Sequence, residues 1–422
     1  MRIEWPEVVQ GMVVSLSTAI ALVPILMAAF GLTFEEAVAI SFLHSVLITS
    51  SIWLFGETYA PGWVTPALPI VLVFVIQGYA TPDERFQMMT ALSLDFAALL
   101  FLLGITGLGK TFFNHVPTAF KAGIILGAAI AAFKRVFVDD FDKLAEVPWS
   151  AGLAIVTCLI FSFSAPFARM KDKIAPLKVI SSLGLLPGFI IAGIAGVITN
   201  ELVFDIQWGI LIPPFADMFA KVSPFAIGWP SLSFFIDAIP MALITYILLF
   251  GDLLTGEAIV KEAQDKRPDD VIDVNINRSH LSIAIRNGLM AIFAPFFPTQ
   301  GCLWTGVQVI VVEKWKEGSD RMESLIGGIS AYYLYGIPVF ILFLPLLTLL
   351  KPFMFIALLL TLILTGFACS YVAIAMVKDR TERGVMLMTA VTLAFFDPTL
   401  GLAVGLLGSL LLIGPEAFKQ QS

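Results

Sequence analysis

Apolar stretches separated by short polar segments follow one another along almost the whole chain of 422 residues. The hydrocarbon core of a bilayer is roughly 30 Å thick, so a helix needs about 20 residues to cross it. Measured against that length, the pattern predicts about fourteen membrane segments, several of them short. Their approximate ranges are 11–30, 37–55, 64–77, 88–106, 120–136, 149–167, 180–199, 234–260, 281–297, 302–313, 324–349, 353–376, 384–396 and 400–413. We therefore expect an all-α polytopic membrane protein.

The composition agrees with a membrane protein and argues against several other classes. The chain is 58% hydrophobic and 14% charged, whereas soluble proteins carry about 25% charged residues. It has no basic tail of the kind that binds nucleic acid. Cys158, Cys302 and Cys369 are widely spaced and form no metal pattern. We also find no nucleophile–base pair and no nucleotide motif, so we expect neither an enzyme nor a bound cofactor or metal.

The third predicted segment of each half is short and follows a Pro/Gly break. The first reads PGWVTPALPIVLVFV over 61–75, and the second reads PTQGCLWTGVQVIVV over 298–312. Paired, interrupted segments in corresponding positions are the best sequence-level indication of a transporter's binding site. An odd number of crossings in each half inverts the second half. We therefore predict inverted repeats at 1–200 and 234–422, joined by an extracellular or periplasmic connector at 201–233.

The distribution of Lys and Arg predicts the orientation. These residues are concentrated in segments such as 169–178 and 261–278, which lie inside the cell if the N-terminus is cytoplasmic. Cytoplasmic loops carry an excess of Lys and Arg. We therefore expect a multi-pass protein of the cytoplasmic membrane with both termini in the cytoplasm.

The two breaks have a chemical consequence. In lipid, every backbone N–H and C=O group must be satisfied within the protein, so an interrupted element is tolerated only in a protein core or beside a polar cavity. Two such elements would direct two helix N-termini, each with free N–H donors and partial positive charge, at one place. That arrangement suits a carbonyl-bearing planar ring, a carboxylate or an inorganic anion. The alternative is that the prolines only kink two packed helices.

Acidic residues within the apolar segments are candidates for ion coupling, because a carboxylate deep in a membrane is a functional hypothesis by default. Asp252 and Glu257 lie in FGDLLTGEAIVKEA, and Asp95 lies in TALSLDFAALL. Asp252 could carry a coupling proton or help to hold Na⁺. The alternatives are a structural cap or pair for Asp252, a solvated side chain for Glu257 and a packing role for Asp95.

The layout resembles the fold shared by uracil/xanthine permeases, sulfate permeases and bicarbonate transporters. FGDLLTGEAIVKEA resembles the eighth span of nucleobase permeases, in which an acidic residue holds the base, and Asp252 is the nearest match. FFPTQGCLWTGVQV resembles the tenth span of both the nucleobase and the sulfate permeases. With the corresponding positions of the first break, the resemblance implies these substrate-binding candidates: Asp252, Thr299, Gln300, Gly301, Cys302, Trp304, Thr305, Thr65 and Ala67.

Two departures separate this chain from both patterns. The arginine of sulfate permeases falls on Thr305, and the glutamate of nucleobase permeases falls on Trp304. The missing arginine disfavours an inorganic anion, and the chain ends soon after its last predicted span, as nucleobase permeases do. We therefore expect a secondary transporter of a small planar solute such as a nucleobase, coupled to H⁺ or Na⁺. The alternative is a transporter of sulfate, bicarbonate or dicarboxylate anions.

The resemblance also implies how such a protein would work. Spans 1–4 and 8–11 would form a core domain that carries the site. Spans 5–7 and 12–14 would form a gate domain that supports a homodimer. Transport would then be an elevator-like movement of the core past the gate.

Overall fold

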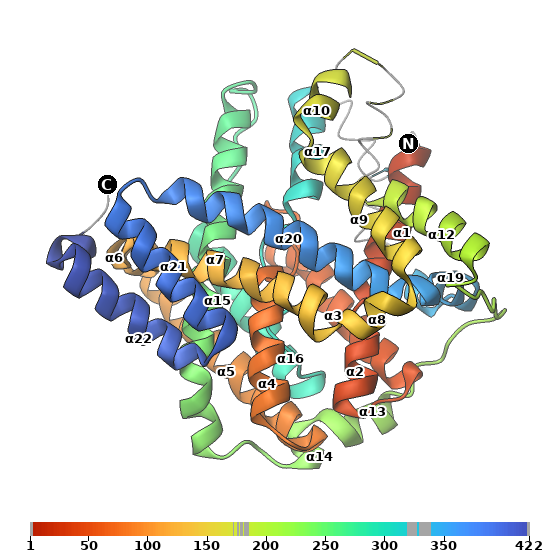
Figure 1. Ribbon diagram of the computed structural model, residues 1–422, viewed down its shortest axis with the longest axis horizontal. Helices are drawn as coiled ribbons and strands as arrows, with labels where there is room; N and C mark the ends of the chain where they lie inside the picture. Colours follow the sequence, from red (N-terminus) through yellow and green to blue (C-terminus); the bar gives the residue numbers. More distant parts are fainter. Residues whose placement is uncertain are drawn as a thin grey trace. The chain divides into compact units, whose positions relative to one another are not determined.

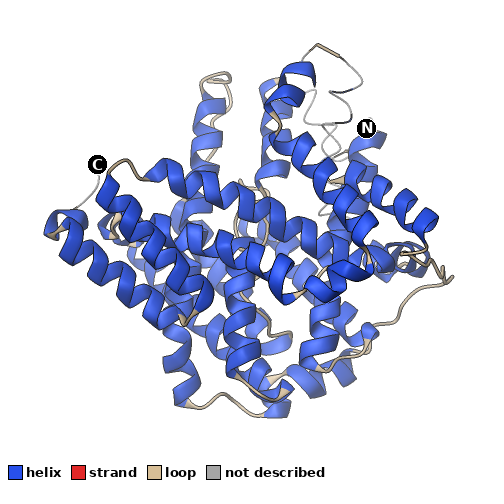
Figure 2. Ribbon diagram, in the orientation of Figure 1, coloured by secondary structure: helices blue, strands red, loops and turns tan. Residues whose placement is uncertain are grey.

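The computed structural model describes residues 3–171, 173–174, 177, 180, 185–318, 327–328 and 339–419. Within these ranges the chain consists of helices and loops, apart from one isolated bridge between Ile210 and Phe343 (Figure 2). The α-helices are α1 (Trp5–Ile20), α2 (Val23–Phe30), α3 (Phe34–Phe55), α4 (Leu68–Gly78), α5 (Pro82–Thr106), α6 (Gly109–His115), α7 (Thr118–Lys134), α8 (Phe141–Glu146), α9 (Pro148–Phe163), α10 (Ala165–Lys171), α12 (Leu186–Thr199), α13 (Phe215–Val222), α14 (Pro224–Ile227), α15 (Leu232–Gln264), α16 (Ile276–Phe293), α17 (Thr305–Lys316), α19 (Leu344–Leu350), α20 (Met354–Met376), α21 (Arg380–Phe395) and α22 (Pro398–Gly408). Short 3-10 helices are η1 (Thr65–Ala67), η4 (Phe340–Leu342), η5 (Lys351–Phe353) and η7 (Pro415–Phe418), and π-helical turns are η2 (Arg135–Asp139) and η6 (Ser409–Ile413).

This is an all-α polytopic membrane protein with broken helices, as predicted. Among the described residues, five helical stretches are long and apolar enough to cross a membrane. They are Glu7–Phe30, Phe34–Phe55, Pro82–Thr106, Leu232–Gln264 and Leu344–Met376. The number rises to seven if each of two sharply bent helix pairs counts as one span.

Several predicted segments differ in detail from the structure. The predicted span 149–167 is bent by 65° where α9 ends and α10 begins, because Ser164 is extended before Pro166. Helix α6 was not predicted, and it meets the following helix at 96°. Parts of the predicted spans 180–199 and 324–349 lie outside the described residues.

The chain forms two compact units, and each takes segments from both halves of the sequence. Unit one consists of Met1–Thr49, Val136–Phe215 and Gly306–Leu364. Unit two consists of Ser50–Arg135, Ala216–Thr305 and Thr365–Ser422. The repeat boundaries and the division into core and gate domains stay predictions.

In unit two, α5 packs on α15 and α16, and α7 lies beside α21, which contacts α22 (Figure 1). Glycines make the second group possible. A Cβ added at Gly123 of α7 would lie 2.6 Å from Thr389 Cβ on α21. A Cβ added at Gly405 of α22 would lie even closer to the Phe120 ring. Small residues that let helix backbones approach are typical of packing in membranes.

In unit one, α9 packs against α12. The Glu201 carboxylate follows α12 and accepts hydrogen bonds from the backbone N–H groups of Trp149 and Ser150, at 3.1 and 2.8 Å, and from Ser150 Oγ at 2.6 Å. Glu201 therefore caps the first turn of α9, whose N–H groups have no partner within the helix.

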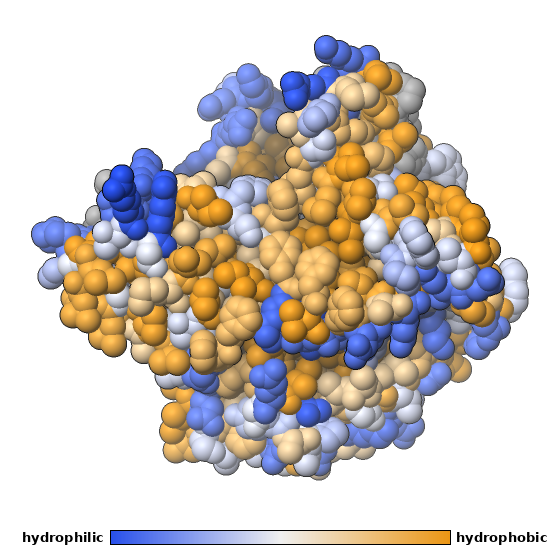
Figure 3. Space-filling view, in the orientation of Figure 1, coloured by the Kyte–Doolittle hydropathy of each residue, from blue (hydrophilic) through white to orange (hydrophobic). Residues whose placement is uncertain are grey.

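The surface carries many exposed apolar side chains, which cover wide areas of the face in Figure 3. Leu54, Leu102, Ile194 and Leu411 are each more than half exposed. Large exposed apolar areas are rare on soluble monomers. Here they provide the surface that lipid contacts.

Candidate functional site

Two extended segments of unit two, residues 60–64 and 299–304, lie side by side and run antiparallel. The Gly301 N–H donates to the Gly62 carbonyl at 2.9 Å, and the Trp304 N–H donates to the Ala60 carbonyl at 2.6 Å. We call this pair of segments the crossing. Its backbone groups therefore find partners in each other, as membrane depth requires.

Glycine is needed on both sides of the crossing. A Cβ added at Gly62 would lie 2.7 Å from the Leu303 carbonyl oxygen, and one added at Gly301 would lie 2.6 Å from the Gly62 carbonyl oxygen. Real Cβ atoms essentially never come that close to another heavy atom. The neighbouring atoms are backbone and cannot rotate away, so only glycine permits this spacing.

Each segment of the crossing leads directly into a helix. The first continues into η1 at Thr65 and then α4, and the second continues into α17 at Thr305. The predicted breaks are therefore non-helical stretches and not kinks within continuous helices. The second helix begins at Thr305, three residues after the predicted start at Cys302, because backbone groups of Gly301 and Trp304 pair with the first segment.

Two predicted site residues, Thr299 and Gln300, are fully buried and hydrogen-bonded within the protein. Thr299 Oγ1 donates to Met290 Sδ at 2.9 Å, and Gln300 Nε2 donates to Thr299 Oγ1 at 2.8 Å. Asn287 Nδ2 also donates to the Gln300 carbonyl at 2.9 Å. These contacts fix the second segment to α16.

The other predicted substrate-binding residues lie along the two segments or at the starts of the helices that follow them. Gly301, Cys302 and Ala67 are buried, Thr65 and Trp304 are half-buried, and Thr305 is exposed. The structure thus brings the predicted residues of both breaks into one region of unit two.

Arg286 of α16 adds a positive charge that the sequence analysis did not assign to the site. Its side chain is buried, with 1% of the residue exposed. Nη2 donates to the Gly301 carbonyl at 3.1 Å, and Nε donates to Ser282 Oγ at 3.3 Å. Nη1 has no hydrogen-bond partner. A guanidinium group stays protonated in proteins, so a fixed cation with a free donor contacts the crossing.

Glu57, between α3 and the first segment, is a second group that the sequence analysis missed. Its Oε2 accepts a hydrogen bond from Ser279 Oγ at 2.7 Å, whereas its buried Oε1 has no partner. Arg286 and Arg278 of α16 act electrostatically on this carboxylate. The structure shows no ion pair between Glu57 and either arginine, so its charge influences Arg286 without direct contact.

The predicted coupling residues have different surroundings. Asp252 of α15 is half-buried, makes no side-chain hydrogen bond in the structure and lies within electrostatic range of Cys302. Glu257 forms an ion pair with Lys261 at 2.5 Å on the same helix. Asp95 of α5 has a buried Oδ2 without a hydrogen-bond partner, and nothing connects it with the crossing. Asp252 is therefore the predicted coupling residue with the clearest relation to the site.

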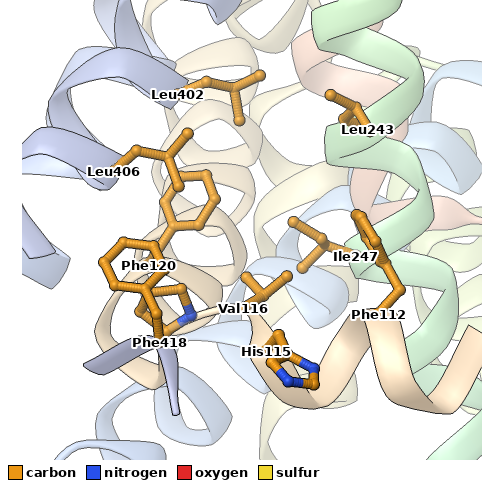
Figure 4. A pocket seen from close by; sticks show the side chains of 10 residues that line it. Phe112, His115, Val116, Phe120, Leu243, Ile247, Leu402, Leu406 and Phe418 are labelled. Carbon is orange, nitrogen blue, oxygen red and sulfur yellow. The ribbon is translucent and has the colours of Figure 1, made fainter. Parts of the chain in front are cut away.

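No metal cluster offers a competing site in the described part of the chain. No group of three or more His, Cys, Asp or Glu residues there could hold a metal ion. A cavity of about 480 Å³ lies elsewhere in unit two, and Figure 4 shows its side chains pointing into it. Apart from His115 its lining is apolar: Phe112, Val116, Pro117, Phe120, Leu243, Ile247, Leu402, Leu406 and Phe418. Such a lining does not suit a charged solute.

Several solved structures are similar to this chain over nearly its full length. Murine solute carrier 26 family member A9, described as an anion transporter in the inward-facing state, matches with 14% identity and a TM-score of 0.53. The match covers 97% of this chain and 68% of that one. A second structure of the same transporter gives 15% identity and a TM-score of 0.54, over 97% and 65% of the two chains.

The transmembrane domain of a cyanobacterial bicarbonate transporter, BicA, also matches, with 13% identity and a TM-score of 0.52. This match covers 96% of the present chain and 99% of that domain. The chain has the fold of these transport domains. No family model and no curated protein sequence matches it. The resemblance noted from the sequence is therefore confirmed for the fold.

Proposed function

We propose that the protein is a secondary transporter of a small inorganic or organic anion, bound at the crossing of the two broken elements. The observation that carries this proposal is the buried Arg286 guanidinium, which contacts the Gly301 carbonyl and keeps a free N–H donor. The likeness to two anion transporters supports it. A buried positive charge with free donors favours a negatively charged ligand.

Arg286 also removes one reason for preferring a nucleobase. That preference rested in part on Thr305, which stands where sulfate permeases have arginine, and in part on Asp252. In this chain α16 supplies an arginine to the same segment from outside it. A nucleobase remains the second candidate, because the Asp252 carboxylate makes no hydrogen bond in the structure and could accept one from a ring N–H.

The proposed mechanism divides the work among several groups. Arg286 attracts the anion and keeps it beside the crossing. Asp252 serves as the site of the coupling ion, H⁺ or Na⁺. From the family resemblance we also propose an elevator-like movement and a homodimer.

Ligand-induced thermal stabilisation of the purified protein tests the substrate class. Sulfate, bicarbonate, nitrate, fumarate, uracil and xanthine would each be added at two pH values. A ligand at 100 times its dissociation constant stabilises the folded state by about 2.7 kcal/mol, which a melting curve detects. We expect at least one anion to stabilise the wild-type protein and Arg286→Gln to abolish the effect. Arg286→Lys is the matched control that keeps the charge. Stabilisation by a nucleobase alone would contradict the proposal.

Asp252→Asn tests the coupling site in proteoliposomes. We expect this variant to bind the anion but to lose its accumulation against a gradient, because a neutral amide cannot exchange a proton or hold Na⁺ as a carboxylate does. Uptake would be measured with and without imposed proton and Na⁺ gradients, with Glu257→Gln as the comparison. Unchanged gradient-driven accumulation in Asp252→Asn would exclude Asp252 as the coupling residue.

A further inference from the structure

Glu57 and Arg286 are oppositely charged groups beside the crossing, and each has one unused hydrogen-bonding atom. Glu57 Oε1 and Arg286 Nη1 are both buried and lack partners. The remaining polar atoms of both side chains are occupied, by Ser279 in one case and by Ser282 and Gly301 in the other. A buried polar atom without a hydrogen-bond partner lowers the stability of the folded protein. Such atoms are uncommon in native proteins, so each of them needs an explanation.

The charge of Glu57 opposes the binding of an anion near Arg286. While Glu57 is ionised, its negative charge offsets that of Arg286 and repels an incoming anion. Once Glu57 is protonated, the positive charge of Arg286 is no longer offset. Salt in the solvent screens these effects less than it screens those between exposed charges, because Arg286 is buried and Glu57 is half-buried.

The other ionisable groups near Glu57 do not provide the same effect. Arg278 and Arg286 of α16 are permanently charged. Tyr59, just before the first segment, and Cys302, on the second, lie within electrostatic range of Glu57. Their side chains are ordinarily neutral at pH 7. Glu257 of α15 acts on Tyr59, but its carboxylate already pairs with Lys261. Asp252 of α15 acts on Cys302 as well, but Glu57 is the acidic group that acts on Arg286 itself. A change in the charge of Glu57 would therefore alter anion binding at Arg286.

We propose that the anion binds together with one proton, which Glu57 takes up from solution and holds on its carboxylate. This inference rests on the proposed function and adds the identity of a proton-binding residue distinct from Asp252. Coupling between two ligands is reciprocal. The bound anion therefore favours the protonated Glu57 as much as the protonated Glu57 favours the anion, and no other reactant is required.

The experiment measures nitrate binding to the purified full-length protein by calorimetry between pH 6 and pH 9. Nitrate suits this purpose because it does not itself change protonation over that range. If another anion gives the larger thermal stabilisation, sulfate would serve as the second probe. For wild type we expect the dissociation constant of nitrate to increase with pH. Uptake of one proton limits this increase to about tenfold per pH unit. A lightly buffered solution should also show proton uptake when the anion is added.

Three variants separate the explanations. Glu57→Gln, which keeps an acceptor for Ser279, should bind the anion as tightly at pH 9 as at pH 6 and take up no proton. Glu57→Asp should restore the pH dependence. Asp252→Asn should retain the wild-type slope for anion binding. Melting temperatures would establish that each variant is folded. If Glu57→Gln does not fold, the pH dependence of nitrate binding to Glu57→Asp and the proton uptake by wild type become the deciding measurements.

The outcomes distinguish this inference from the function on which it rests. If no anion binds at any pH, the proposed function fails. If an anion binds to wild type without pH dependence or proton uptake, the proposed function stands and the role of Glu57 is overturned. If Glu57→Gln keeps the wild-type dependence of anion binding on pH, the role of Glu57 is also overturned. If Asp252→Asn loses that dependence, Asp252 and not Glu57 binds the proton.

Discussion

Replacing Gly62 by alanine should separate the two extended segments. The added Cβ would lie 2.7 Å from the Leu303 carbonyl oxygen and 3.0 Å from the Trp304 nitrogen. All of these neighbours are backbone atoms, so no rotamer change relieves the clash. The segments must move apart, and the hydrogen bonds from Gly301 to Gly62 and from Trp304 to Ala60 lengthen or break.

The size of the effect follows from two contributions. Forcing an extra carbon into a packed interior costs about 1–3 kcal/mol. Losing a buried backbone hydrogen bond, which leaves both its groups unsatisfied, costs about 1–3 kcal/mol more. We therefore expect Gly62→Ala to destabilise the protein by about 2–6 kcal/mol. Gly301→Ala should behave similarly, since its Cβ would lie 2.6 Å from the Gly62 carbonyl oxygen.

Thermal unfolding in detergent and uptake in proteoliposomes measure the two consequences. Gly62→Ala should melt below wild type and lose both anion-induced stabilisation and uptake. Gly251→Ala is the matched control, because a Cβ at Gly251 of α15 meets nothing within 4 Å and alanine is favoured over glycine in a helix by about 0.5–1 kcal/mol. Wild-type melting and uptake in Gly62→Ala would refute the close contact of the two segments.

Two further predictions concern parts of the molecule away from the crossing. Burial alone would raise the pKa of Glu201, but its hydrogen bonds from Ser150 and Trp149 outweigh burial and hold that pKa below its ordinary value. The stabilisation that the ionised Glu201 carboxylate provides is therefore present above the ordinary pKa of a glutamate. It is lost as the pH falls through the lowered pKa of Glu201. Glu201→Gln should cost about 1 kcal/mol at pH 7 and progressively less in acid, and a pH-independent difference in melting temperature would contradict this. Gly123→Val should destabilise the protein by about 1–3 kcal/mol, because the larger side chain disrupts the contact of α7 with Thr389. Gly152→Val is the control and should melt almost as wild type, because a Cβ at Gly152 meets nothing within 4 Å. Equal melting temperatures for the two variants would show that α7 and α21 are not packed this closely.

The breaks could be predicted from the sequence because their signals are local. Proline and glycine interrupt an apolar pattern wherever they occur, so PGWVTP and PTQG were recognisable without knowledge of their partners. The start of α17 was misplaced by three residues for the opposite reason. Whether residues 302–304 continue a helix depends on hydrogen bonds to residues 60–62, which are far away in the sequence.

The two charged residues of the site could not be found in the same way. Arg286 is visible in the sequence as a lone arginine within a predicted span, but nothing nearby indicates that it contacts Gly301. Glu57 is separated by 222 positions from Ser279, its hydrogen-bond partner. A polar residue that finds its partner through tertiary packing leaves no periodic signal. The backbone pattern therefore indicated the two breaks, while the charged groups beside them became apparent only in three dimensions.

The source of that charge has a consequence for any transport cycle. An arginine at position 305 would belong to the second broken element itself. Arg286 instead belongs to α16 and contacts the crossing through the Gly301 carbonyl. Arg286, Glu57, Gly62 and Gly301 all belong to unit two. Hydrogen bonds join α16 to the second segment and to Glu57, which lies just before the first segment, and close backbone contacts join the two segments to each other. A movement of that unit would therefore carry the positive charge, its compensating carboxylate and the crossing together. The anion's electrostatic surroundings within the unit would stay the same throughout the movement, and protonation of Glu57 would be the event that changes them.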